Sequence, residues 1–138
     1  MKITTNVRNA LADILGTIFD GGTGIIEGRT GSPPTNAGDA LTGTVVYTVA
    51  MPSDTFGAAA AGVVSKAGTW QDTAADADGT VGYCVMRKSG DTTGADETVP
   101  RVLLTVGQGS GEMNHQNLAI NTGQQVTVTA FTFTQPAA

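Results

Sequence analysis

The segment at residues 124–135, QQVTVTAFTFTQ, alternates apolar residues with threonine and constrains the fold more than any other part of the chain. Side chains two positions apart lie on the same face of a β-strand, so Val126 and Val128 are predicted to share a face opposite the threonines. The alternation changes phase between Ala130 and Phe131. This change predicts either a β-bulge or a strand covered on both faces, as occurs where one strand serves two sheets.

Other segments of similar composition are separated by turn-forming residues. The chain has 22 threonines and 19 glycines; threonine favours strands and glycine favours tight turns. We therefore expect an all-β fold, an antiparallel β-sandwich of about seven to eight strands. The segment 56–62, FGAAAAG, is expected to be a close-packed bend. Strands are predicted at residues 25–29, 41–51, 62–70, 80–88, 98–107 and 124–135, with a weaker one through 118–120.

The exception is an amphipathic helix predicted over residues 5–19, TNVRNALADILGTIF. Its apolar residues recur at three- and four-residue spacing, and Asp20-Gly21-Gly22 is predicted to end it. We expect the apolar stripe to pack on the protein's own sheet, and docking on a neighbouring subunit is the alternative. The stripe comprises Val7, Leu11, Ile14, Leu15 and Ile18, and the polar face comprises Arg8, Asn9, Asp13 and Thr17.

The length of the chain indicates one domain, and its charge and hydropathy argue against nucleic-acid binding and membrane attachment. The 138 residues fit one domain, with a helical segment at 1–22 and the β-sandwich at 23–138. The net charge of −5 and the lack of a Lys/Arg run argue against direct binding to nucleic acid. No apolar run approaches the ~18 residues of a membrane helix, and the N-terminus lacks a secretion signal. We expect a protein made in a cytoplasm, without membrane attachment.

The aspartates in QDTAADADGTVGYCVMR, residues 71–87, raise the question of a metal site. With Gly79 at position 6 of a calcium loop, Asp76 and Asp78 fall at ligand positions 3 and 5. The alanine at position 1 and the valine at position 12 do not fit. Asp-Gly before an apolar strand is also a strong turn signal. We therefore predict a turn and no cofactor, with a weak cation site at Asp76 and Asp78 as the alternative.

Candidate catalytic groups do not form a recognisable motif. Cys84 lies among apolar residues and is predicted to be a small buried residue. His115 lies in the polar stretch EMNHQN and is predicted in a surface loop. Ser110, in GQGSGE, does not match the G-x-S-x-G nucleophile elbow. Trp70, the only tryptophan, is expected to anchor a core or an interface. We expect no catalytic residues and no enzymatic activity.

Several segments, in order, resemble a family of small structural proteins encoded among the virion genes of tailed bacteriophages. The similar segments are IIEGRTG, SPPTNAGDALTGT, PSDTFGAAAAGVVS, TAADADGTVGYCVMRKSGDT and LAINTGQQVTVTAFTFTQP. The chain departs from the family over residues 94–114, where the family is variable. The resemblance implies a β-sandwich that decorates or joins parts of a virion without enzymatic activity.

The resemblance leads us to expect a capsid decoration (cement) protein. It would be made in the host cytoplasm, would bind the major capsid shell and would act as a homo-oligomer. The alternatives are a neck, tail or fibre-base component of the virion and, from another class, a carbohydrate-binding β-sandwich. The expected contacts come from the helix and from the loops at 30–40 and 107–117. They are Val7, Leu11, Ile14, Ile18, Pro33, Pro34, Met113 and His115.

Overall fold

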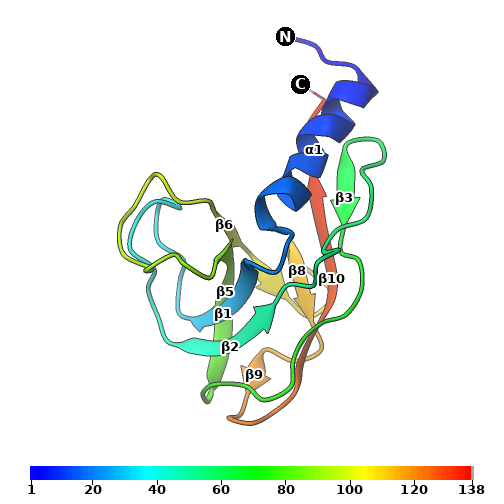
Figure 1. Cartoon of the computed structure of the whole chain (residues 1–138). Coiled ribbons are helices and arrows are strands. Elements are labelled where there is room, and N and C mark those ends of the chain that lie inside the picture. Colours follow the sequence, from blue (N-terminus) through cyan, green and yellow to red (C-terminus); the bar gives the residue numbers. More distant parts are fainter. Residues whose placement is uncertain (138) are drawn as a thin grey trace.

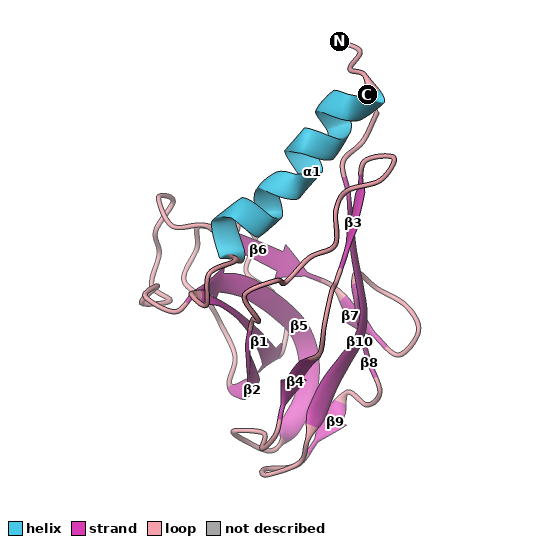
Figure 2. Cartoon of the chain, turned by 45° about the vertical axis from the view of Figure 1, so that its right-hand side comes forward, coloured by secondary structure: helices cyan, strands magenta, loops and turns pink. Residues whose placement is uncertain are grey.

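The computed structural model describes residues 1–137, which form two five-stranded sheets and one N-terminal helix (Figures 1 and 2). One sheet has the order β2-β1-β5-β6, with β9 paired to β5. The other has the order β3-β10-β8-β7, with β4 paired to β10. The elements are α1 (Thr5–Phe19), β1 (Gly24–Thr30), β2 (Val45–Ala50), β3 (Val63–Ser65), β4 (Trp70–Asp72), β5 (Gly79–Lys88), β6 (Arg101–Leu104), β7 (Val106–Gly107), β8 (Met113–His115), β9 (Ala119–Ile120) and β10 (Val126–Thr134).

The predicted short strand at 25–29 is confirmed as β1, and it lies in the middle of its sheet. Ile26 faces Val49 of β2 on one side and Met86 of β5 on the other, and both pairings are antiparallel. Gly28 allows the Tyr47 ring to cross the strand, since a Cβ there would lie 2.1 Å from the ring. A central strand covered on both sides explains why β1 is buried along most of its length.

The phase change in the closing segment is a β-bulge, which confirms the first of the two predicted alternatives. The pairing of β10 with β8 shifts register between Val128 and Ala130. The bulge leaves Ala130 exposed and returns Phe131 to the buried face. The strand pairs with β4 and β8 before or at this point and with β3 after it.

Several sequence-based assignments differ from the structure, and the strand predicted at 41–51 begins only at Val45. The segment 62–70 is divided into β3 and β4, with Gly68 at φ +67° between them. The segment 98–107 is divided into β6 and β7. Strand β8 was predicted as part of a loop, because its sequence, Met-Asn-His, has no apolar alternation. It pairs with β7 in parallel, and the other strand pairs of the described residues are antiparallel.

The core draws apolar side chains from both sheets and from one side of α1. Trp70 is fully buried. Its ring lies 5.5 Å from that of Phe131 and 5.6 Å from that of Phe56, measured between centroids. The expectation that Trp70 anchors a core is confirmed. No helix of the described residues is long and apolar enough to cross a membrane.

Candidate functional site

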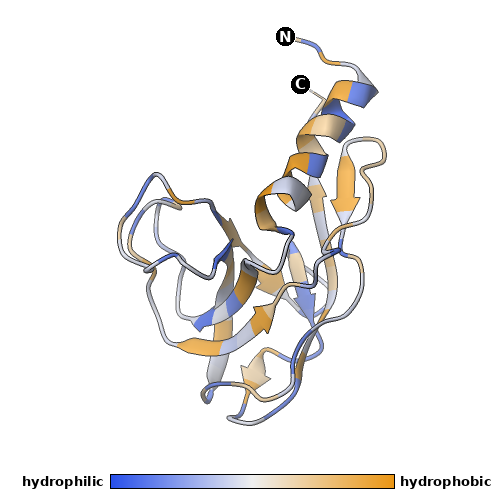
Figure 3. Cartoon of the chain, in the orientation of Figure 1, coloured by the Kyte–Doolittle hydropathy of each residue, from blue (hydrophilic) through white to orange (hydrophobic). Residues whose placement is uncertain are grey.

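Helix α1 is joined to the rest of the protein by polar side chains that bind the bend at 56–62 and Gln135, and by a buried apolar side. The side chain of Thr4 caps its start by accepting a hydrogen bond from the backbone N–H of Val7 at 3.4 Å. The helix lies beside β3 and the end of β10, and its N-terminal end points away from β1, β2 and β5 (Figures 1 and 2). Its hydrophobic and hydrophilic segments alternate along the ribbon (Figure 3).

Three of the four residues of the predicted polar face of α1 are hydrogen-bonded to the protein's own backbone, although Asp13 and Thr17 remain exposed. Asp13 Oδ1 accepts from the backbone N–H of Ala59 at 2.8 Å, and Asn9 Oδ1 accepts from that of Gly62 at 2.7 Å. Arg8 donates to the backbone carbonyls of Ala61 at 2.8 Å and Gln135 at 3.2 Å. The bend at 56–62 has backbone groups that lack strand partners, and polar side chains satisfy them better than apolar ones would.

Most of the predicted apolar stripe lies on the outside of the molecule. Val7 is 45% exposed, Leu11 42% and Ile14 51%. The expectation that these three side chains pack on the protein's own sheet is wrong, whereas Leu15 is buried and Ile18 packs at the edge of the core. The buried side of α1 lies next to the exposed stripe on the helix surface. It consists of Ala12, Leu15 and Phe19, which attach the helix through apolar contact.

The exposed stripe carries no charge. Ala10 and Thr17, which flank it, are also exposed, and both are small and uncharged. The two charged residues within α1, Arg8 and Asp13, are hydrogen-bonded to the bend and to the end of the chain. Water therefore meets an apolar ridge along the outer side of the helix, and such surfaces mark sites of protein–protein contact.

Pro33 and Pro34 line a second apolar surface, a groove beside β6. Its volume is about 480 Å³. Tyr83, Leu103 and Val106 line it as well. The sequence predicted the two prolines as contact residues but could not place the other three beside them, because they come from strands distant along the chain.

Met113 and His115 are buried, at 0% and 2% exposure, and are removed from the candidate contacts. The expectation that His115 lies in a surface loop is wrong, because β8 carries it between other strands. Its Nε2 is hydrogen-bonded to the hydroxyl of Tyr47, and that hydroxyl lies 3.1 Å from Cys84 Sγ. The signal that sequence analysis lacked is the pairing of β8 with β10.

Burial decides the protonation of this cluster. It lowers the pKa of His115 to about 4 and raises that of Cys84 to about 12. The pKa of Tyr47 is raised well above 10, by burial and then by Cys84. All three groups are neutral near pH 7. The thiol is protonated and enclosed, so it lacks the properties of a reactive cysteine, and the prediction that Cys84 is a small buried residue is confirmed.

The aspartates at 72–78 accept hydrogen bonds from β2 and from the turn that follows β9. Asp76 Oδ2 accepts from the Thr48 hydroxyl at 3.0 Å, and Asp78 Oδ1 accepts from the backbone N–H of Thr122 at 2.6 Å. The bond to Thr122 lowers the pKa of Asp78. Residues 73–78 are irregular and lead into β5, in agreement with the predicted turn. Among the described residues no three His, Cys, Asp or Glu side chains are grouped as metal ligands.

A buried ionic network joins strands β1 and β5 and the segment that follows β5 to β6, and sequence analysis did not find it. Glu27 on β1 accepts from Arg29 Nε at 2.9 Å and pairs with Arg87 on β5. Arg101 on β6 binds both carboxylate oxygens of Asp91 at 2.5 Å. This pairing lowers the pKa of Asp91. Charges on alternate positions of a buried strand were the available signal, because such charges require partners.

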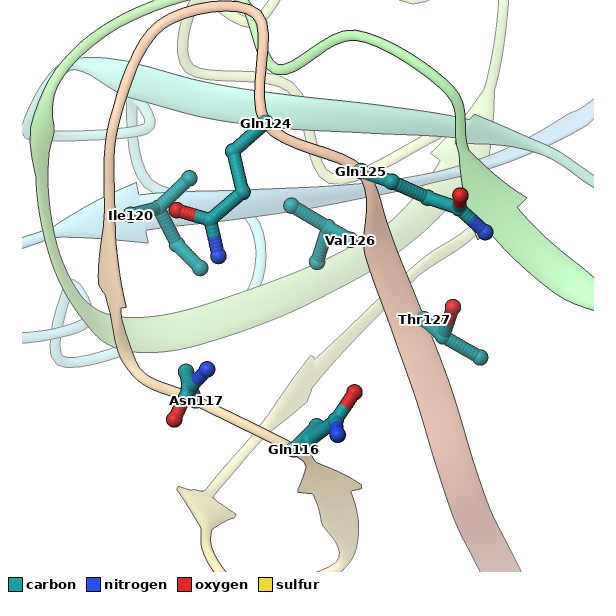
Figure 4. A pocket seen from close by; sticks show the side chains of 7 residues that line it. All are labelled: Gln116, Asn117, Ile120, Gln124, Gln125, Val126 and Thr127. Atoms are coloured by element: carbon teal, nitrogen blue, oxygen red, sulfur yellow. The ribbon is translucent and has the colours of Figure 1, made fainter.

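The pocket between β9 and β10 is too small for an organic ligand. Figure 4 shows the amide side chains of Gln116, Asn117, Gln124 and Gln125 around Ile120 and Val126. The cavity volume is about 20 Å³, which is enough for about one water molecule.

Comparisons of the chain with models of known protein families, with curated proteins and with solved structures find no match. The surfaces of the molecule are therefore the guide to its function.

Proposed function

We propose that this chain is a non-enzymatic structural protein of a tailed-phage virion, a decoration protein that binds the assembled major capsid shell. The observation that carries the proposal is the presence of two separate apolar surfaces on one small chain: the outer side of α1 and the groove beside Pro33 and Pro34. A protein that bridges subunits needs at least two contact surfaces. The order of the phage-like sequence segments supplies the virion context.

The proposed fold within this role is a β-sandwich. Support comes from the core, in which Ile26 and Met86 of one sheet belong to the same cluster as Val128 and Phe131 of the other. Side chains from two facing sheets that share one core are typical of sandwiches. A rigid body of this kind suits a protein that must hold its contact surfaces at fixed separation.

The groups most capable of covalent chemistry support a non-enzymatic role. Cys84 and His115 are enclosed, and burial keeps the thiol protonated and the imidazole neutral near pH 7. Charged residues make up 14% of the chain, against about 25% in average domains. Low charge density suits broad, weakly polar contacts repeated many times over a shell.

The shell proposal is tested with purified capsids of the virion that carries the gene. A ligand that binds only the assembled state stabilises that state by mass action. We expect the purified protein to bind capsids and to raise the temperature at which they release their contents. Leu103→Asp, which places a charge in the groove beside Pro33 and leaves α1 unchanged, should weaken this binding. No binding and no thermal shift with the unaltered protein would contradict the proposal.

The number of copies in purified particles separates the shell from the neck, tail or fibre base. Hundreds of copies per particle would indicate the shell, whereas a dozen or fewer would indicate the neck or tail. Absence of the chain from purified particles would contradict a virion role altogether. Quantitative mass spectrometry of particles gives this number directly.

A further inference from the structure

The exposed side of α1 has the spacing of a coiled-coil seam. Val7, Leu11, Ile14 and Ile18 are separated by four, three and four residues. In heptad notation this spacing places Val7 and Ile14 at d and Leu11 and Ile18 at a. Residues at a and d face a partner helix of the same kind. The spacing over these four positions fits another α-helix, packed nearly along α1, as the partner.

From this seam we propose that α1 joins copies of this chain into a parallel bundle of three or more helices. In a homo-oligomer with cyclic symmetry the same patch meets itself around an axis, so any charge on the patch would face its own copy. The stripe has none. Arg8 and Asp13 are turned toward the protein's own backbone, at 2.8 Å from Ala61 and Ala59. An uncharged patch on a chain of net charge −5 is suited to a second copy.

The residues at the seam favour more than two helices. Two-stranded coils prefer β-branched residues at a and leucine at d, whereas leucine at a with isoleucine at d shifts the preference to three or four strands. Leu11 at a and Ile14 at d have the second arrangement. The small exposed residues Ala10 and Thr17, both at g, widen the uncharged side so that a second neighbouring helix can approach.

The small size of the helix also favours a bundle of more than two helices. A stable interface buries about 800 Å² on each partner and involves about 20–30 residues. One stripe on a 15-residue helix is too small for a stable dimer. In a bundle of three or more, each helix contacts two neighbours and covers more of its circumference. We expect association to be weak for free chains and to increase with concentration.

The direction of α1 decides where the sheets lie in a parallel bundle. Its N-terminal end points away from β1, β2 and β5 (Figures 1 and 2). A parallel bundle therefore places the sheets of all copies at one end, with their grooves free for another partner. The helix bundle does not depend on a role in a virion. The bundle proposal and the virion proposal can therefore be contradicted independently of each other.

The first test is sedimentation of the purified chain from low to high micromolar concentration. We expect a mass that rises with concentration toward three or more times 13.9 kDa. Ile14→Asp should remain a monomer at every concentration. Asn6→Asp is the matched control, because it adds the same charge to an exposed position of α1 outside the seam. A monomer of the unaltered chain throughout, or an oligomer unaffected by Ile14→Asp, would overturn the proposal.

The second test fixes the orientation through a single introduced thiol. In a parallel bundle Val7 meets Val7 of the next copy, within the reach of a disulfide. In an antiparallel arrangement it would lie near Ile18, about 16 Å along the helix from its counterpart. Val7→Cys should therefore form linked dimers on mild oxidation. Ser53→Cys, in an exposed turn, should not, and the enclosed Cys84 should not interfere. Failure of Val7→Cys to link chains that sediment as oligomers would overturn the parallel bundle.

Discussion

Asp13 on α1 and Ala59 in the bend at 56–62 are joined by a hydrogen bond of 2.8 Å from the backbone N–H of Ala59 to the carboxylate. This contact, together with that of Asn9 to Gly62 at 2.7 Å, places the polar side of an amphipathic helix against its own protein. The next residue, Ile14, is thereby turned outward and is 51% exposed.

Replacing Asp13 with alanine should loosen the helix from the bend. We expect a loss of about 1 kcal/mol in the free energy of unfolding, since a hydrogen bond to a charged group is lost but water can reach the freed amide. Hydrogen exchange at the Ala59 amide should become faster. Asn6→Ala, at an exposed position of the same helix, is the control. An unchanged exchange rate at Ala59 would show that this bond does not hold the helix.

Leu11 and Leu15 give the sharpest comparison of the two sides of α1. Leu15→Ala should lower the free energy of unfolding by about 2–4 kcal/mol, because it removes buried side-chain volume. Leu11→Ala should change it by less than about 0.5 kcal/mol in dilute solution, because that side chain is exposed. Urea unfolding of both variants measures the difference. Equal losses would mean that the stripe packs on the body of the protein.

His115 should make stability depend on mildly acidic pH. Its pKa is about 4 when folded and about 6.5 when unfolded, so the unfolded chain binds the additional proton between these values. The contribution of His115 to the free energy of unfolding should therefore decrease by about 3 kcal/mol as the pH falls from about 6.5 to 4, and His115 should add no further pH dependence below pH 4. Denaturant unfolding at several pH values in this range gives the free energy of unfolding as a function of pH. This free energy should change less steeply with pH in His115→Gln than in the unaltered chain. Identical slopes would contradict the burial of His115.

Glu27 should be essential to the first sheet. Glu27→Gln leaves the buried guanidinium groups of Arg29 and Arg87 without their counter-charge, and breaking a buried ionic contact in this way costs about 3–5 kcal/mol. Chemical denaturation and expression as soluble protein are the measurements. Glu97→Gln, at an exposed position, should be nearly neutral. A stable Glu27→Gln variant would show that the network is dispensable.

Local sequence patterns predicted the elements that local physics controls. The strand at 80–88 and the helix at 5–19 were placed within one residue at either end, because alternation and helical spacing act over a few neighbours. The phase change at Ala130 predicted the bulge as one of two alternatives, and the register shift between β10 and β8 decided between them. The short strand β8 was missed, because three residues without apolar alternation become a strand only when β10 and β7 pair with them.

The candidate contact residues were likewise predicted in part from the sequence and in part only from the tertiary structure. Sequence alone determined that this is a β-rich chain with one amphipathic helix, and that Val7, Leu11, Ile14 and Ile18 lie on one side of it. Only the tertiary structure decided that most of this side faces outward and that His115 faces inward. The physical reason is that helical spacing sets which residues share a face, whereas the direction of that face depends on the surroundings. Here the unpaired backbone groups of a distant bend attract the polar face of α1.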